Sequence, residues 1–181
     1  MTQSQYIDLK FAIIDAGYEH EITWIENIQP CMSSDDFFGE AVWVILNSGM
    51  KEQIARQIWN RIQKAWGDSK PTSSAFRHEG KVKAIDFIRK NKQDIFDQYF
   101  GCAEPLIFLE SLPFIGSITK YHLAKNLGID CVKPDRHLVR IAKEYNFKDC
   151  FEMCNLISSI TGDKVSLIDM VLWRAANLGM I

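Results

Sequence analysis

The sequence has no internal repeat, no low-complexity stretch and no alternating apolar and polar run that would indicate a β-strand. No apolar run is long enough to cross a bilayer, and no signal peptide precedes the first polar residues. These absences argue against β-rich, repeat and membrane-spanning architectures. We therefore expect a soluble, cytoplasmic protein.

Cysteine is also sparse. The five cysteines are an odd number and most lie far apart, which is typical of reduced thiols rather than of a disulfide framework. Cys150 and Cys154 are four residues apart, so they share one face of a helix. We expect both to be core thiols.

Apolar residues recur at helical spacing through most of the sequence. A chain of 181 residues with 47% apolar content can bury one good core and has room for two lobes. Residues 68–78 are rich in polar and turn residues and are expected to form a loop. Helices are predicted at 37–46, 54–67, 79–91, 93–100 and 104–111, with further helices opened by Asp135, Asp149 and Lys164. This pattern predicts an all-α protein of about ten short helices.

Charge is distributed unevenly along the chain. Residues 1–40 carry one lysine against eight acids, while residues 51–92 carry eleven basic residues against four acids. Residues 117–148 carry seven basic residues against three acids. Solvated helix faces are one explanation of such runs. The other is a basic face that contacts a phosphate backbone, with an acidic face turned away.

The segment 112–141 combines a Gly-containing hairpin with two helix starts. Ser117 is a good helix N-cap, and the unpaired N–H groups of a helix N-terminus attract anions. Gly128 would end this helix in a left-handed conformation, and Pro134 would open the next one with Asp135 in its first turn. This arrangement can hold one phosphate on backbone amides and direct one carboxylate at a nearby sugar.

The same segment resembles the helix-hairpin-helix DNA glycosylases of the endonuclease III superfamily. The hairpin match consists of Leu112, Pro113, Gly116 and Thr119, and the match to a later Asp-x-His segment consists of Asp135 and His137. Residues 37–62 resemble the family's helix–turn–helix more weakly. The resemblance implies two helical lobes, one formed by 31–122 and the other by 1–30 plus 123–181.

The function implied is a monomeric DNA N-glycosylase of base excision repair, associated with the nucleoid if bacterial. It would flip a damaged or mismatched base out of double-stranded DNA and hydrolyse its N-glycosidic bond. Asp135 is the catalytic candidate, although a helix-start Asp can also serve only as a cap. The candidates for DNA contact are Gly116, Ser117, Ile118, Thr119, Lys120 and His137. By resemblance, the backbone carbonyls of Glu110, Leu112 and Ile115 would hold a monovalent cation.

The sequence departs from the family at several positions. Ile118 replaces the lysine with which lyase-active members form a Schiff base, which implies a monofunctional enzyme unless Lys133 substitutes for it. Phe114 stands where the family has the first hairpin glycine. The wedge candidates are Ser48 and Met50, and the base-pocket candidates are Phe37, Phe38, Trp43, Phe114 and Trp173.

No cofactor is required by this prediction. Endonuclease III carries a four-cysteine iron–sulfur loop near its C-terminus, whereas only Cys150 and Cys154 lie in the matching region here, so no cluster is expected. Two other functions stay open. One is a non-catalytic DNA-binding protein on the same scaffold, and the other is a small helical module whose hairpin recruits a protein.

Overall fold

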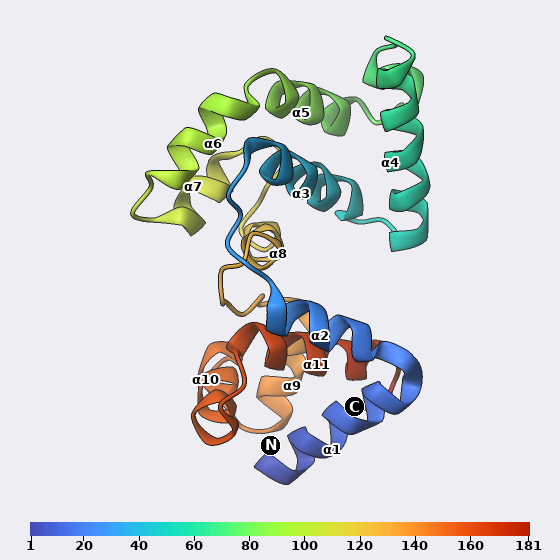
Figure 1. The fold of residues 1–181 in the computed structure, drawn as a ribbon. Coiled ribbons are helices and arrows are strands. Elements are labelled where there is room, and N and C mark those ends of the chain that lie inside the picture. The colour runs from blue at the N-terminus through green and yellow to red at the C-terminus, as the bar shows by residue number, and fades with distance from the viewer. The chain divides into compact units, whose positions relative to one another are not determined.

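The computed structural model describes all 181 residues and contains helices but no strands (Figure 1). The predicted all-α class is therefore confirmed. The helices are α1 (Gln3–Ile13), α2 (Glu19–Asn27), α3 (Ser34–Asn47), α4 (Glu52–Gly67), α5 (Glu79–Lys90), α6 (Lys92–Phe100), α7 (Pro105–Ser111), α8 (Thr119–Asn126), α9 (Arg136–Glu144), α10 (Cys150–Thr161) and α11 (Val165–Asn177). Two short turns are also helical: η1 (Ile14–Tyr18) and η2 (Thr72–Ser74). None of these helices combines the length and the apolar character that crossing a membrane demands.

The chain divides into two compact units. The central unit is Pro30–Leu127, and the terminal unit combines Met1–Gln29 with Gly128–Ile181. The sequence placed the second boundary after residue 122, which falls inside α8. Because α8 packs on α3 and α7, the whole helix belongs to the central unit. The carbonyl of Leu127 also accepts the N–H of Cys31 at 3.0 Å, which joins the two ends of this unit.

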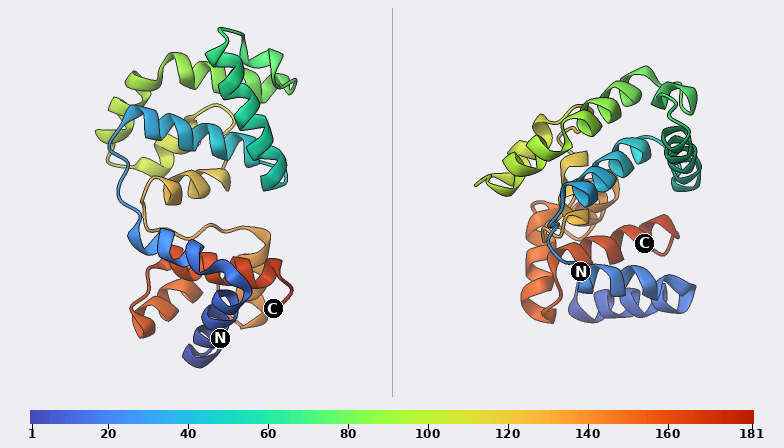
Figure 2. Two further views of the ribbon diagram at one scale, coloured as in Figure 1. Left: turned by 45° about the vertical axis from the view of Figure 1, so that its right-hand side comes forward. Right: turned by 45° about the horizontal axis from the view of Figure 1, so that its top comes forward.

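Helix α3 forms the core of the central unit. It contacts α4, α5, α6 and α8, and Figures 1 and 2 show α5 and α6 alongside it. The buried side chains of α3 are Phe37, Ala41, Val42, Val44, Ile45 and Leu46. Asp36 and Ser33 cap its first turn, and the predicted stop at Gly49 has a φ of +69°.

The loop between α4 and α5 contains more order than the sequence indicated. Its turn η2 buries Thr72, whose hydroxyl accepts a hydrogen bond from the indole N–H of Trp66 at 2.9 Å. The same hydroxyl donates to Asp86 at 2.5 Å. This chain of hydrogen bonds fixes the end of α4 against α5.

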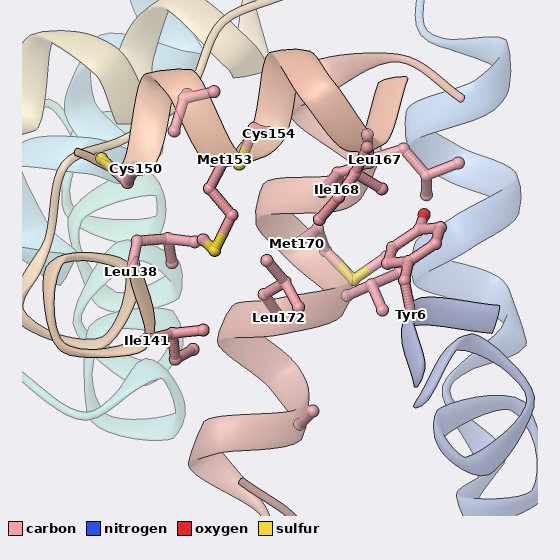
Figure 3. Close-up of a cluster of buried hydrophobic side chains, with 14 of the residues drawn as sticks. Tyr6, Leu138, Ile141, Cys150, Met153, Cys154, Leu167, Ile168, Met170 and Leu172 are labelled. Atoms are coloured by element: carbon pink, nitrogen blue, oxygen red, sulfur yellow. The ribbon is translucent and has the colours of Figure 1, made fainter. Parts of the chain in front are cut away.

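Helix α11 forms the core of the terminal unit. Figure 3 shows its apolar side chains between those of α9 and α10 on one side and Tyr6 of α1 on the other. The Tyr6 hydroxyl is buried and donates to Asp163 at 2.7 Å. Cys150 and Cys154 are buried in this core and form no disulfide, as predicted.

Candidate functional site

The predicted site residues divide between the two units. The hairpin, the wedge candidates and most pocket candidates lie in the central unit, whereas Asp135, His137 and Trp173 lie in the terminal unit. The geometry is described within each unit.

The hairpin between α7 and α8 is anchored by two buried side chains. Leu112 and Ile115 are 6% and 4% exposed, and the Ile115 N–H donates to the Leu112 carbonyl at 3.1 Å. Phe114, between them, has a φ of +68°. A bulky residue in this left-handed region is strained, whereas glycine is not. The backbone thus keeps a turn suited to glycine although the sequence has replaced it.

The start of α8 differs from the sequence prediction. Ser117 was expected to cap the helix, but α8 begins at Thr119 and the cap position is Ile118, which has no capping side chain. The Thr119 hydroxyl instead accepts the Gly116 N–H at 2.7 Å, which holds the hairpin turn against the first turn of the helix and leaves the helix itself uncapped. Threonine can do so from inside the first turn because its hydroxyl folds back on the preceding backbone.

Three consecutive amides remain available at this helix start. The N–H groups of Ser117, Ile118 and Thr119 donate to no protein acceptor, whereas that of Gly116 is occupied. Such amides, at the positive end of a helix dipole, suit an oxygen anion. A Cβ added to Gly116 would meet nothing closer than 3.9 Å, so the face of the turn there is open.

Phe114 packs against the N-terminus of α5. Its ring meets the imidazole of His78 edge-on at a centroid distance of 5.6 Å, and the ammonium of Lys81 lies 5.7 Å from the ring centre. Gly80 provides the space for this contact, since a Cβ there would stand 3.2 Å from the Phe114 ring. Phe114 is still 38% exposed.

Lys81 is a site residue that the sequence analysis missed. It is 3% exposed, and its ammonium donates to the carbonyls of Leu46 at 2.9 Å and Ser48 at 2.6 Å. It therefore closes the C-terminus of α3 and joins the wedge segment to the aromatic ring of the hairpin. Desolvation lowers its pKa. Its spacing from the buried Ile85 and Ile88 placed it on the apolar face of α5, which was the signal available in the sequence.

Lys120 is less available for DNA than predicted. Its ammonium lies 2.5 Å from a carboxylate oxygen of Glu110, and this hydrogen bond raises the pKa of Lys120. The ammonium also lies 5.3 Å from the ring centre of Tyr121. Ile118, by contrast, is 40% exposed.

The pocket candidates have different environments. Phe37 is fully buried and packs on Phe96 and Tyr99, so it is a core residue without a surface for a base, and that prediction was wrong. Helical periodicity could not separate a core aromatic from a pocket aromatic. Phe38 packs on two tryptophans of α4, and Trp43 lies beneath the guanidinium of Arg56 at 5.0 Å. Trp173 packs on the core of the terminal unit.

Asp135 is held at the start of α9. It occupies the N-cap position, so the helix begins at Arg136, two residues after the start at Pro134 that the sequence indicated. One carboxylate oxygen, Oδ1, accepts the N–H groups of His137 at 2.9 Å and Leu138 at 3.2 Å. The other, Oδ2, lies 3.9 Å from the ammonium of Lys133. The Asp135 side chain is 13% exposed, so it is a largely desolvated carboxylate of fixed direction with one oxygen not used by the cap.

No known protein-family model matches the chain, and no curated protein matches it. The chain is similar in structure to the 8-oxoguanine glycosylase/lyase of Methanocaldococcus jannaschii, crystallised with a 15mer DNA containing 8-oxoguanine. The match covers 98% of this chain and 97% of that one, with a TM-score of 0.69 and 18% sequence identity. The two proteins share a fold. The two-lobed glycosylase fold predicted from the hairpin is thereby confirmed.

Proposed function

We propose that this protein is a DNA N-glycosylase of base excision repair that acts on double-stranded DNA with a damaged or mismatched base. The observation that carries the proposal is Asp135: a largely buried carboxylate, aimed by two backbone amides, on a glycosylase fold. A carboxylate that served only as a helix cap would not need to be buried.

The chemistry follows from what glycosidic cleavage needs. As the bond between base and deoxyribose breaks, positive charge develops on the sugar, and a fixed carboxylate in a dry site stabilises it. Because Oδ1 is occupied by the cap, Oδ2 of Asp135 is the oxygen for this task and for orienting or deprotonating a water. No resident metal is needed for this step.

The hairpin supplies the proposed DNA contact. The free amides of Ser117, Ile118 and Thr119 would bind one phosphate, and the carbonyls of the hairpin would bind a monovalent cation. The donor set suits such an ion: the carbonyls of Glu110 and Ile115 accept no backbone N–H, and that of Leu112 accepts one. A cation there would add positive charge next to the same phosphate.

Base extrusion requires a wedge and a surface for the exposed bases. Ser48 and Met50 remain the wedge candidates, because the turn that carries them is rigidly closed by Lys81. Phe114 remains the best supported pocket or stacking candidate, since its ring is exposed and supported by His78.

Hydrolysis without strand cleavage is the proposed outcome, because Ile118 cannot form an imine. Lys120, the next amine on α8, is engaged with Glu110. Borohydride should therefore trap no covalent complex with a damaged duplex, and strands should break only after alkali. Trapping that disappears in Lys133→Ala would show instead that the amine beside Asp135 acts as the nucleophile.

The decisive experiment is single-turnover base release from a panel of single-lesion duplexes, beginning with 8-oxoguanine. Asp135→Asn should slow release about 100- to 1000-fold, since it removes one preorganised charge. Affinity for the same duplex should stay within several-fold, because the Asn oxygen can keep the cap. Asp149→Asn is the matched control: Asp149 caps α10 in the same unit and accepts from Glu152 N–H at 2.8 Å.

A non-catalytic DNA-binding protein on this scaffold is the alternative, favoured only by the isoleucine at position 118. It would bind duplex DNA but release no base from any substrate of the panel. Base release by Asp135→Asn at the parent rate would reject the catalytic role of Asp135.

A further inference from the structure

The loop that carries Asp135 is tied to α11 by a buried carboxylate. Asp169 is 2% exposed and accepts a hydrogen bond from the N–H of Lys133. The Lys133 carbonyl in turn accepts the N–H of Asp135 at 2.8 Å. Two hydrogen bonds thus connect Asp169 to the backbone of the residue proposed to act on the sugar.

Asp169 stands in an unusual place for a carboxylate. Its neighbours Leu167, Ile168, Val171 and Leu172 are all buried, so it interrupts the most apolar stretch of α11. Burying a carboxylate is costly unless it is hydrogen-bonded, and an apolar residue could serve the core at least as well. The stability of α11 alone therefore does not explain Asp169.

The side chain of Lys133 adds a second link. Its ammonium lies 3.9 Å from Oδ2 of Asp135, the oxygen that the cap leaves unused. A rotation of the Lys133 peptide would move both this ammonium and the Asp135 amide. Lys133 therefore contacts Asp135 at its backbone N–H and at Oδ2, in addition to the cap that holds Oδ1.

We propose that Asp169 is a positioning residue that fixes Lys133 and, through it, the free oxygen of Asp135. The proposal rests on the glycosylase function proposed above. Misplacing a reacting group by about 1 Å costs on the order of 100-fold in rate, so Asp169→Ala should slow base release by about that factor. Affinity for the lesion duplex should change little, because no DNA contact is lost. Asp169→Asn keeps an acceptor oxygen and should recover most of the rate.

Asp130 provides the matched control. It belongs to the same loop and accepts the N–H of Ser166 at 2.8 Å, so it also ties this loop to the start of α11. It lies five residues from Asp135, and its bond does not pass through Lys133. Asp130→Ala removes this hydrogen bond at an exposed residue and should leave the rate of base release at the parent value, and a melting curve measures the stability that each variant loses.

Amide hydrogen exchange supplies a readout that needs no turnover. Exchange at Lys133 and Asp135 should accelerate in Asp169→Ala and stay slow in Asp130→Ala. Unchanged exchange in Asp169→Ala overturns the inference, even for a parent protein that releases no base. So does a parent rate in Asp169→Ala, or an equal slowing in both variants that follows their loss of stability. If Asp169→Ala does not fold, Asp169→Asn decides: exchange at Lys133 and Asp135 must be faster than in the parent protein, with a loss of rate smaller than the roughly 100-fold loss given for alanine, and parent exchange overturns the inference.

Discussion

Two neighbouring hairpin residues have opposite backbone requirements. Gly116 has an ordinary φ and open space around it, so no steric rule of the free protein demands glycine there. Phe114 has the left-handed φ that glycine would adopt without strain. In the free protein, therefore, the conformation would favour glycine at position 114 rather than at position 116.

This difference gives a prediction for Gly116. Gly116→Ala should leave the free energy of unfolding within about 0.5 kcal/mol of the parent value, as for an unhindered surface substitution. It should nevertheless weaken duplex binding, because its methyl group occupies the space where a phosphate would approach the free amides. Melting curves and binding titrations on one duplex would separate the two effects. Unchanged affinity would show that no phosphate approaches the turn at this point.

Cys150 gives a pH prediction. Burial raises its pKa to about 11, and the nearby carboxylates of Asp169, Asp149 and Asp135 add to the effect. The folded protein then keeps a proton that the unfolded chain loses. The stabilisation is complete below the ordinary thiol pKa and is lost as pH rises towards about 11. Urea unfolding at about pH 8 and about pH 10.5 should show a smaller decrease in stability for Cys150→Ala than for the parent. Equal decreases would contradict the assignment.

The sequence proposed Asp135 as a site residue but neither Lys81 nor Asp169. Asp135 belongs to a local pattern, a hairpin and a Pro-Asp helix start, and local patterns are readable from one sequence. The roles of Lys81 and Asp169 depend on which backbone groups of other elements lie opposite them. Their only signal was a charged residue on an apolar helix face.

At the level of secondary structure, one lysine connects three segments. Lys81 of α5 closes the end of α3 and lies over the ring of Phe114 in the hairpin. Because its partners are carbonyls that lack other donors, its removal leaves buried acceptors unpaired. Lys81 should therefore contribute to stability far more than an ordinary surface lysine.

Lys81→Met should lower the free energy of unfolding by about 1–3 kcal/mol. Lys83→Met, on the same helix, is the control. Lys83 is 74% exposed and forms an i,i+4 pair with Glu79, which is worth less than about 0.5 kcal/mol. Urea denaturation of the two variants measures the difference. Equal losses of stability in the two variants would mean that the hydrogen bonds of the Lys81 ammonium only offset the free-energy cost of burying it.

The helices themselves were largely predictable. Predicted ranges such as 79–91 and 93–100 agree with α5 and α6 to within one residue, because apolar spacing and glycine stops are local. The stops at Gly49 and Gly128 have φ values of +69° and +86°. The start of α8 and the order in the α4–α5 loop were missed, since each depends on a threonine hydroxyl finding a partner.

At the level of the whole molecule, charge separates the two units. The central unit carries 13 basic and 11 acidic residues, and the terminal unit carries 8 and 12. Several basic side chains of the central unit are already paired with carboxylates, including Arg56, Lys70, Lys92 and Lys120. The net excess in the central unit is therefore carried by a few unpaired cations such as Arg61, Lys64 and Arg77. These are the groups expected to contact phosphates.

Duplex affinity should fall steeply with salt, because each neutralised phosphate releases counterions. Arg77→Gln should weaken binding to all sequences alike and reduce the slope of log K against log salt by about one. Arg77 is exposed and adjoins His78, which supports the Phe114 ring. Arg56→Gln is the control, since Arg56 is already paired with Glu52 at 2.8 Å. A salt-independent affinity would remove the case for DNA as the partner.

Composition and spacing could not reveal this arrangement. The runs of charge were visible along the chain, but ion pairs such as Lys120 with Glu110 and Lys92 with Asp35 join residues of different helices. Which cations stay unpaired is a property of the folded chain. The fold shared with the solved structure likewise needed the folded chain: the hairpin sequence suggested it, and the structural match established it.

The contact between Gly80 and Phe114 makes the best residue at one position depend on the residue at the other. Alanine at position 80 would stabilise helix α5 by about 1 kcal/mol relative to glycine. Its methyl group, however, would lie 3.2 Å from the Phe114 ring. With Phe114→Gly in place, Gly80→Ala should be stabilising; in the present chain it should be neutral or harmful. A double-mutant cycle of melting curves would show this change of sign. The effect of alanine at position 80 thus depends on the residue at position 114, although the two positions are 34 apart in sequence.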